Sequence, residues 1–277
     1  MKPSSLRLIL AATVFTGACA THEAAPKPPA PPPSVPAPQP ASPPMPPAAV
    51  PTTPVAPAVP RRPSAPQLGD GVHWFRTSAE YRAIAVSTYR AATEAVNLAV
   101  KGKAPDSWAV SLDADETVLD NSVFQRDLAL GTAPFSEDLW ATFVRRRASV
   151  PVPGAKAFLE AVKALGGRIA IVTNRFDHLC EDTRENFRLQ NLPFDVILCR
   201  VDIGDKHPRF ASVASGAAFG DGKAREVVAF LGDNILDFPA LKQSLRDEPD
   251  SAFEPFGRRF FVLPNPMYGS WQQVPPR

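Results

Sequence analysis

The feature that most constrains this chain is a pair of aspartates separated by one residue, which comes directly after a short apolar run. The run covers residues 108–110 and leads into Ser-Leu-Asp-Ala-Asp-Glu-Thr at residues 111–117. Trp and Val favour strands, and a run this short suits a buried strand. In an open α/β sheet, ligands bind just beyond the carboxyl ends of the strands. We therefore expect Asp113 and Asp115 to meet in a crevice at that edge of a sheet.

The closeness of these two carboxylates has a metal-binding and a structural interpretation. Like charges held together repel unless another group offsets them. Mg²⁺ prefers oxygen ligands and a small number of protein carboxylates, so it would suit this place. A solvated acidic turn that caps the strand is the simpler alternative. The choice depends on which other side chains the fold brings to the same edge.

The first 18 residues have the pattern of an export signal of the lipoprotein type. A short basic segment precedes an apolar core at residues 8–15, which is too short to span a bilayer as a mature helix. Small residues before Cys19 resemble the lipobox of bacterial lipoproteins, although Thr16 stands where Leu is usual. An ordinary secretory signal is the alternative, so we expect either an outer membrane lipoprotein, which Ala20 favours, or a periplasmic protein.

Residues 19–70 are rich in Pro and Ala, and they hold most of the 33 prolines of the chain. Such segments favour extended polyproline II and bury no core, so we expect a disordered tether between the anchor and a folded domain. The net charge of +2 is nearly balanced, and no basic block stands out. The sequence therefore gives no support for binding a nucleic acid polymer.

The segment after the tether, residues 71–277, is long enough for one α/β domain with an insert. A capping-box pattern at residues 77–80 predicts a long helix up to Gly102. Strands and helices then alternate, which implies a doubly wound, Rossmann-like parallel sheet with helices on both faces. The further strands are predicted at residues 168–174, 195–199, 227–233 and 259–263, and helices at residues 154–165 and 177–190.

An insert over about residues 121–150 follows the first strand. Residues 121–134 are predicted to be irregular, and residues 136–147 to form a helix that contains Trp140. This position predicts a small helical cap above the ends of the strands.

Polar clusters follow successive predicted strands or stand in the loops beyond them. A parallel sheet would bring all of them to one edge. The clusters are Asp113 with Asp115 and Thr117, Thr173 with Asn174 and Arg175, Lys206 alone, and Asp233 with Asp237.

Structural roles compete with functional ones for some of these residues. Thr173 and Asn174 could cap the following helix, and Asp237 could be an N-cap. A lone lysine is usually a surface charge, and Lys223 competes with Lys206 for a place in the site. The spacing to a nearby arginine favours Lys206.

The order and type of these motifs resemble those of the haloacid dehalogenase superfamily, and more closely those of the class C acid phosphatases. Those proteins are secreted or lipid-anchored bacterial phosphomonoesterases and 5′-nucleotidases. The resemblance runs from about Trp74 to Trp271. It is carried by Asp-x-Asp-Glu-Thr-Val-Leu-Asp-Asn-Ser ending at Ser122, Val-Thr-Asn-Arg ending at Arg175, Gly-Asp-Asn-x-x-Asp-Phe ending at Phe238, and Leu-Pro-Asn-Pro-Met-Tyr-Gly ending at Gly269.

The resemblance implies a phosphatase in which two acids divide the work. Asp113 would attack phosphorus and form an aspartyl-phosphate. Asp115 would protonate the leaving alkoxide and then accept a proton from the hydrolytic water. Thr173 and Asn174 would hydrogen-bond the phosphoryl oxygens, and Lys206 would neutralise their charge.

The resemblance also implies a Mg²⁺ cofactor. Asp113, Asp233 and the backbone carbonyl of Asp115 would hold the ion, with water and phosphate as its other ligands. Asp237 would orient a metal-bound water or bind the ion directly.

Three residues are assigned to substrate binding: Trp140, Arg175 and Tyr268. Trp140 and Tyr268 match two aromatics that, in the resembled family, sandwich a nucleobase or another aromatic leaving group. Stacking tolerates many bases, which suits a phosphomonoesterase acting on nucleoside 5′-monophosphates and aromatic phosphates. A packing role for Trp140 and a loop anchor at Tyr268 are the alternatives.

Other questions stay open at the level of the sequence. A phosphotransferase would use the same covalent intermediate. A surface ligand-binding lipoprotein with vestigial catalysis would not need Asp115. Cys180 and Cys199 could form a disulfide in an oxidising compartment or stay as two buried free thiols.

Overall fold

The computed structural model describes residues 68–131, 133–202 and 204–276. The chain divides into two units, Met1–Val59 and Pro60–Arg277, and every described residue belongs to the second. The predicted signal sequence, the lipidation site at Cys19 and residues 19–67 of the tether therefore lie outside the described residues. Within the described part, the helices are too short or too polar to cross a bilayer.

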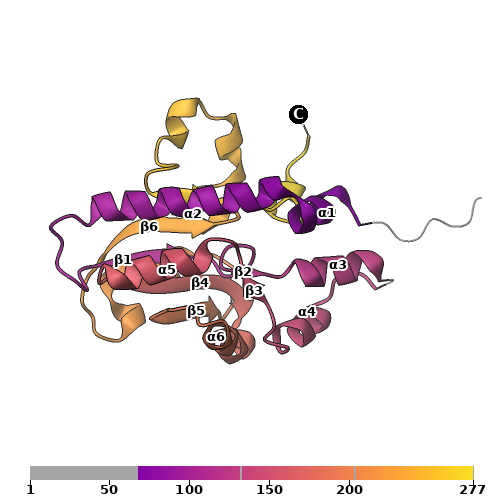
Figure 1. Cartoon of the computed structure of the whole chain (residues 1–277), viewed down its shortest axis with the longest axis horizontal. Helices are drawn as coiled ribbons and strands as arrows, with labels where there is room; N and C mark the ends of the chain where they lie inside the picture. Colours follow the sequence, from indigo (N-terminus) through magenta and orange to yellow (C-terminus); the bar gives the residue numbers. More distant parts are fainter. Residues whose placement is uncertain (1–67, 132, 203, 277) are drawn as a thin grey trace, which may run out of the picture. The chain divides into compact units, whose positions relative to one another are not determined.

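A five-stranded parallel sheet with the order β5-β4-β1-β6-β7 forms the centre of the described unit (Figure 1). The chain builds outward from β1 through β4 to β5 and then crosses to the other side of β1 for β6 and β7. This reversal beside β1 creates the crevice in which open α/β sheets bind ligands. The strands are β1 (Trp108–Leu112), β4 (Arg168–Phe176), β5 (Val196–Arg200), β6 (Glu226–Gly232) and β7 (Phe260–Val262).

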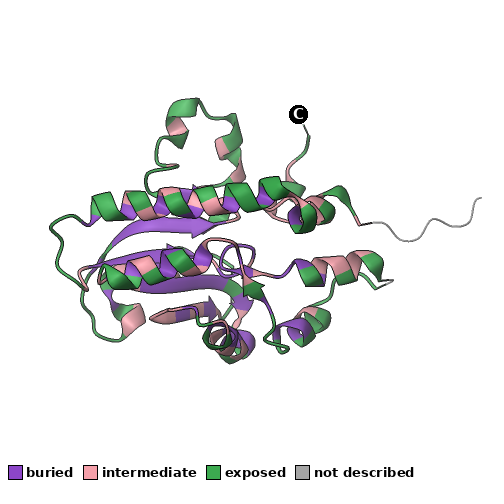
Figure 2. Cartoon of the chain, in the orientation of Figure 1, coloured by how far each residue is buried: buried purple, intermediate pink, exposed green. Residues whose placement is uncertain are grey.

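Helices cover both faces of the sheet, which confirms the predicted α/β class. On one face α2 (Ala79–Ala99) and α5 (Ala155–Ala164) pack on the strands, and α6 (Cys180–Leu189) lies beside β5. On the other face α7 (His207–Ser215) places Phe210 and Val213 against β1, β4 and β6. The sheet is therefore buried from both sides, as the purple strands between the helices show (Figure 2).

The start of the domain differs from the sequence prediction. The residues before the long helix form a helix of their own, α1 (Asp70–Thr77), which Thr77 closes by donating its hydroxyl to the His73 carbonyl. The N-cap of α2 is Ser78, whose hydroxyl accepts from the Tyr81 amide at 3.0 Å. The capping box predicted from Thr77 was therefore wrong by one residue.

The insert holds two helices, and its base is closed by the antiparallel pair β2 (Leu119–Asp120) and β3 (Val150–Pro151). The irregular structure predicted for residues 121–134 was wrong over α3 (Ser122–Leu130). No side chain caps α3, but its Phe124 packs against aromatic rings of α4 (Glu137–Val144). This tertiary contact stabilises a nine-residue helix that local sequence alone would leave marginal.

The two cysteines of the described unit form a disulfide between Cys180 at the start of α6 and Cys199 in β5. This resolves the alternative of two free thiols that the sequence left open. The bond joins two residues that are 19 positions apart in the sequence and so closes a loop of about that length. In the chain-entropy description, a loop of this size contributes about 3 kcal/mol to stability.

Candidate active site

A cavity of about 570 Å³ opens at the carboxyl ends of the strands. Three parts of the fold line it: the ends of β4 and β5 with the loops after β1, β5 and β6, the insert, and the last loop of the chain. The insert contributes aromatic side chains and the loops contribute charged ones. Of the predicted site residues, the lining includes Asp113, Asp115, Trp140, Asn174, Arg175, Lys206, Asp233, Asp237 and Tyr268.

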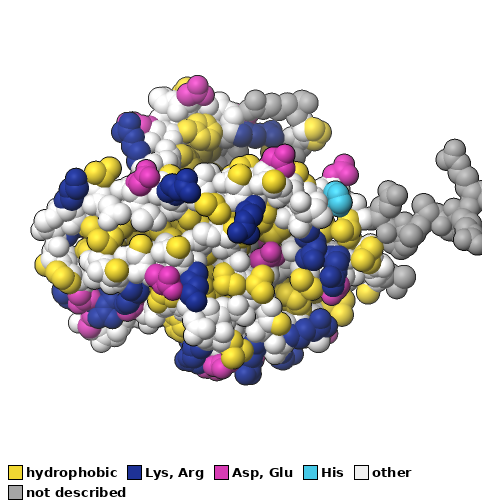
Figure 3. Space-filling view, viewed as in Figure 1, with side chains coloured by type: hydrophobic (Ala, Val, Ile, Leu, Met, Phe, Trp, Pro, Cys, Tyr) yellow, Lys and Arg dark blue, Asp and Glu magenta, His cyan; other side chains and the backbone are white. Residues whose placement is uncertain are grey.

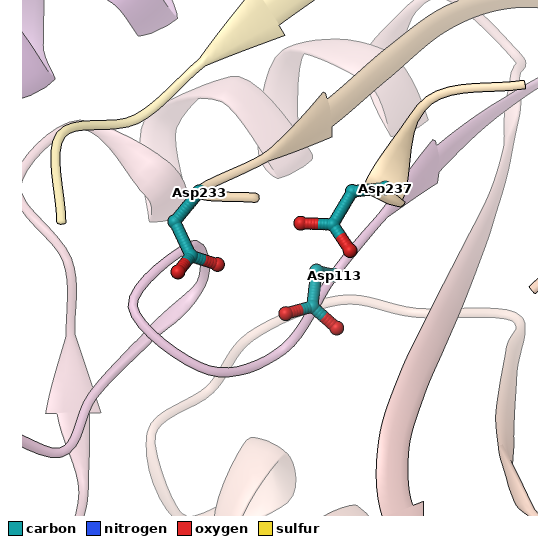
Figure 4. A group of neighbouring side chains, drawn as sticks. All are labelled: Asp113, Asp233 and Asp237. Atoms are coloured by element: carbon teal, nitrogen blue, oxygen red, sulfur yellow. The ribbon is translucent and has the colours of Figure 1, made fainter. Parts of the chain in front are cut away.

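Three aspartates converge at this cavity. Asp113 lies directly after β1 and Asp233 lies directly after β6. Asp237 ends the short helical turn Ile235–Asp237. One carboxylate oxygen from each lies within 4.8 Å of the other two. The close-up shows the three carboxylates grouped around one space (Figure 4). The chain therefore supplies three hard oxygen donors at the place where the strand order reverses.

Local hydrogen bonds fix the position of Asp237. The Asn234 amide donates to its Oδ2 at 2.9 Å, and Asn234 Oδ1 accepts from the Leu236 amide. Asp237 is thus the acidic member of a capping box whose N-cap is Asn234. The N-cap is thus Asn234 and not Asp237, which the sequence had left as a candidate for that role. The other oxygen of Asp237, Oδ1, faces the cluster.

Lys206 joins the acids of this cluster. Its ammonium lies 2.6 Å from Asp113 Oδ1 and 2.7 Å from Asp237 Oδ1, and its side chain is 3% exposed. The competing candidate, Lys223, is exposed and pairs with Asp106 instead. The structure thus brings Lys206, and not Lys223, to the three aspartates.

Burial and the neighbouring charges shift the pKa values of the groups in this cluster. Burial raises the pKa of Asp113 to about 7, aided by the Asp237 and Asp115 charges, although Lys206 opposes the shift. Burial and the charges of Asp237 and Asp113 also raise the pKa of Asp233 well above its ordinary value. Burial alone would lower the pKa of Lys206, but its two carboxylate partners raise it further than burial lowers it. A further cation would favour the charged form of the aspartates.

Asp115 faces a different set of partners. Its Oδ1 accepts from Arg175 Nε and Nη2 at 2.9 and 2.7 Å and from Asn121 Nδ2 at 2.7 Å. Its carboxylate is not part of the group formed by the three aspartates. The two acids of the central motif are thus directed to different environments, one at a cluster of acids and one at a guanidinium.

Arg175, predicted to bind substrate, lines the cavity but is buried by its protein contacts. Besides Asp115, its guanidinium donates to Thr183 and to Asn121. Its guanidinium carbon also lies 5.3 Å from the ring centroid of Trp140. The side chain therefore connects the second acid of the motif to the insert.

Thr173 and Asn174 differ in their access to the cavity. Thr173 is fully buried, and its hydroxyl accepts from the Arg175 amide at 3.2 Å. Asn174 is exposed to the cavity, and its Oδ1 accepts from Arg209 at 2.6 Å. Arg209 also donates to the Thr173 carbonyl, so one arginine orients the end of β4.

The two predicted aromatic residues both line the cavity. Trp140 stands on α4, with its ring centroid 5.0 Å from that of Phe124 and 5.6 Å from that of Phe143. Tyr268 stands in the last loop and donates its hydroxyl to Glu116. The alternative roles considered for them, packing and anchoring, are thus present together with a place on the cavity wall.

Three polar residues of the site had no role assigned from the sequence. Asn121 donates to Asp115, Asn265 donates to Asp233 Oδ2 at 2.8 Å, and Glu116 accepts from Tyr268. Glu116 is fully buried, and burial together with the Asp115 and Asp233 charges raises its pKa well above the ordinary value. The available signal was their position inside the motif stretches, because a polar residue next to a catalytic one often supports it.

Comparisons with known proteins agree with this geometry. A family model described as HAD superfamily, subfamily IIIB (Acid phosphatase) matches residues 55–271. A solved structure of the class C acid phosphatase from Bacillus anthracis is 26% identical and superposes with a TM-score of 0.65, with 74% of this chain and 86% of that chain covered. A structure of the Bacillus anthracis class C acid phosphatase with tungstate bound is 25% identical, with the same TM-score and coverage.

Proposed function

We propose a specific reaction for this chain, which belongs to the acid phosphatases of HAD superfamily subfamily IIIB. The chain is a phosphomonoesterase. We infer that it hydrolyses nucleoside 5′-monophosphates and aromatic phosphates with Mg²⁺, through an aspartyl-phosphate on Asp113. The observation that carries this proposal is the convergence of Asp113, Asp233, Asp237 and Lys206 at the end of one cavity.

The donor set fits a hard divalent cation. Asp113, Asp233 and Asp237 would hold the ion, because all their ligand atoms are carboxylate oxygens within 4.8 Å of one another. When bound there, Mg²⁺ would offset the negative charge of the carboxylates and of the phosphoryl group. Thr117 and Asn265 each donate a hydrogen bond to Asp233, and these bonds would keep its two oxygens oriented.

In the first half of the reaction, a carboxylate oxygen of Asp113 attacks phosphorus, and the bond from phosphorus to the ester oxygen breaks. Asp115 gives its proton to the departing alkoxide. All three hydrogen bonds that Asp115 accepts from Arg175 and Asn121 go to Oδ1, so Oδ2 is the oxygen suited to hold that proton.

In the second half, Asp115 Oδ2 takes a proton from a water molecule as the water oxygen attacks phosphorus. The bond from phosphorus to Asp113 breaks, which releases inorganic phosphate and restores the Asp113 carboxylate. Each acid returns to its starting state, so the cycle balances for one water consumed per ester.

Lys206 and Asn174 would bind the phosphoryl oxygens. Phosphoryl transfer depends mainly on positioning and on neutralising charge, so a buried ammonium beside the nucleophile suits the task. The aromatic wall formed by Trp140 and Tyr268 would receive the leaving group, since a ring can stack on any base.

A panel of phosphomonoesters tests this function. We expect the purified mature chain to release phosphate from nucleoside monophosphates and aryl phosphates in the presence of Mg²⁺. A chelator should abolish the release, and added Mg²⁺ should restore it. Full turnover after confirmed removal of divalent metal would contradict the metal requirement, and an inactive chain that binds nucleotide would favour a ligand-binding role.

Metal binding has a readout that is independent of turnover. An ion that binds only the folded state raises the free energy of unfolding by about 2.7 kcal/mol at a hundred times its dissociation constant. We expect Mg²⁺ to raise the melting temperature of the chain, and Asp233→Asn to weaken that rise. An equal rise in both proteins would place the ion elsewhere.

We also propose that the chain is exported and anchored through a lipid on Cys19. The basis is the N-terminal pattern of charged, apolar and small residues before the cysteine. Cys19→Ser should release the protein from the membrane fraction or block its processing. Unchanged membrane association and mature mass would contradict the anchor.

A further inference from the structure

Arg200, the last residue of β5, lines the cavity beside the predicted phosphate-binding residues. Its guanidinium carbon lies 3.7 Å from the ring centroid of Phe176, the last residue of β4. The residue before it, Cys199, is held to α6 by the disulfide. The guanidinium is therefore stacked on a ring at the end of a tethered strand.

Arg200 differs from the other cations of the cavity in its partners. The Arg175 guanidinium is paired with Asp115, and the Lys206 ammonium with Asp113 and Asp237. Among the described residues, Arg200 has no carboxylate within ion-pair distance, and its buried Nε has no hydrogen-bond partner. A buried donor without a partner costs free energy, and a guanidinium carries five N–H donors. An anion in the cavity would give this guanidinium, through its outer N–H groups, the partner that the protein does not supply.

The neighbourhood of Gly204 shows where such an anion would lie. A methyl group built on Gly204 would be 3.4 Å from Asn174 Nδ2 and 3.9 Å from Arg200 Nη1. The amide of Asn174 and the guanidinium of Arg200 thus border the same small space. Arg209 donates to Asn174 Oδ1 at 2.6 Å, so a second guanidinium lies on the other side of the same amide. Two guanidinium groups near one another favour a negatively charged occupant.

We propose that Arg200 is a specificity residue that binds a second anionic group on the leaving group of the substrate. The preferred substrates would then be phosphomonoesters that carry a further phosphate or carboxylate. The inference rests on the proposed phosphatase function and adds a substrate class to it. The phosphoryl group that reacts would occupy the end of the cavity at Asp113 and Lys206, and the second anion would lie against Arg200 on the β5 side.

A matched pair of nucleotides tests this assignment. Adenosine 5′-monophosphate and adenosine 3′,5′-bisphosphate share the ring and the reacting ester and differ by one phosphate. Phenyl phosphate and its carboxyphenyl counterparts repeat the comparison with a carboxylate. We expect the wild-type chain to hydrolyse the doubly anionic member of at least one pair with the higher kcat/KM.

Arg200→Gln should remove that preference. Loss of a hydrogen bond to a charged group lowers affinity roughly ten- to a hundredfold, so kcat/KM for the preferred anionic member should fall by about this factor. The loss should lie mainly in KM. For the member of each pair that has only one anionic group, kcat/KM should change less than about threefold. Arg200→Lys should retain part of the preference because it keeps the charge. Arg90→Gln, an exposed arginine of α2 with the same change in net charge, should leave both substrates unaffected.

The outcomes separate the two proposals. No hydrolysis of any substrate by the wild-type chain would overturn the proposed function itself. Hydrolysis with no preference for the doubly anionic substrates, or a loss in Arg200→Gln that is equal for both members of a pair, would overturn only the role of Arg200. Hydrolysis of the substrate with only one anionic group also reports whether the variant is folded, so a misfolded protein would not be mistaken for lost specificity. If Arg200→Gln is misfolded, Arg200→Lys decides whether Arg200 sets the specificity.

Discussion

Tyr268 donates its phenolic hydrogen to the carboxylate of Glu116, a residue of the same loop that carries Asp113 and Asp115. The other oxygen of Glu116 accepts from the Asn121 amide at 2.8 Å. Glu116 itself has a φ of 51°, a left-handed conformation that is uncommon for a residue with a side chain. One buried acid therefore joins the catalytic loop, the base of the insert and the last loop of the chain.

This bond predicts different results for two substitutions of Tyr268. Tyr268→Phe keeps the ring but leaves one oxygen of buried Glu116 without its donor, so the free energy of unfolding should fall by about 1–3 kcal/mol. Tyr268→Ala also removes the ring from the cavity. Its kcat/KM for nucleoside monophosphates should fall by roughly 5- to 150-fold, because stacking is worth about 1–3 kcal/mol per base.

Trp140→Ala should give a loss of the same kind, and an internal comparison isolates it. A small aliphatic phosphomonoester has no ring to stack, so its kcat/KM should fall much less in either variant. Steady-state kinetics with both substrates in one preparation cancels general damage to the fold. Equal factors for ringed and aliphatic substrates would assign Trp140 and Tyr268 to packing alone.

Substitutions of the two acids of the central motif should have different effects on activity. Asp113→Asn removes the nucleophile, so turnover should fall to background. Asp115→Asn removes proton transfer, which typically contributes 10²–10⁴-fold, and should spare phosphate binding more than turnover. Single-turnover rates and phosphate binding measure the two effects separately. Asp250→Asn, an exposed residue outside the cavity, is the matched control. Substantial activity in Asp113→Asn would exclude an aspartyl-phosphate on that residue.

Lys206 and Lys223 offer a matched pair of lysine substitutions. Lys206→Met should lower kcat on the order of 10²–10³-fold, since it removes one preorganised group that stabilises developing charge. It should also destabilise the fold, because the buried Asp237 and the half-buried Asp113 would both lose their cation. Lys223→Met removes an exposed charge outside the cavity and should leave kcat unchanged. Similar kinetics for the two variants would contradict the position assigned to Lys206.

Asp221 should stabilise the fold at neutral pH, and this contribution should be lost in acid. Hydrogen bonds from Arg225 and from the Lys223 amide lower the pKa of Asp221 from 3.8 to about 2. A carboxyl with a lowered pKa in the folded state stabilises the fold above its ordinary pKa, and the effect disappears as the pH falls through the lowered value. The contribution should be small because Asp221 is exposed to solvent screening.

Denaturation of wild type and Asp221→Asn between pH 7 and pH 2 measures this effect. The difference in unfolding free energy should be constant at neutral pH and shrink toward zero between pH 3.8 and about pH 2. High salt should reduce it throughout, because exposed charges are screened. A difference that stays unchanged down to pH 2 would show that Asp221 acts through something other than its charge.

Much of the fold followed from local patterns. The strands β1, β4, β5, β6 and β7 are short apolar runs between helical segments, and a buried parallel sheet needs both faces of each strand to be apolar. Because the carboxyl ends of parallel strands lie at one edge, the polar residues after them could be expected to meet there. The prediction failed at α3, where contacts between Phe124 and the rings of α4 stabilise a helix without a capping side chain.

The sequence by itself indicated most of the residues that reach the cavity: acids, a lysine and an asparagine at the ends of apolar strands or in the loops beyond them. Only the tertiary structure decided how they are paired. Asp113 turns to Lys206 across 93 residues, Asp115 turns to Arg175 across 60, and Tyr268 reaches Glu116 across 152. Such pairings depend on side-chain direction and on which charges burial leaves without water. Neither is encoded in a local pattern, because each partner comes from a different element of the fold.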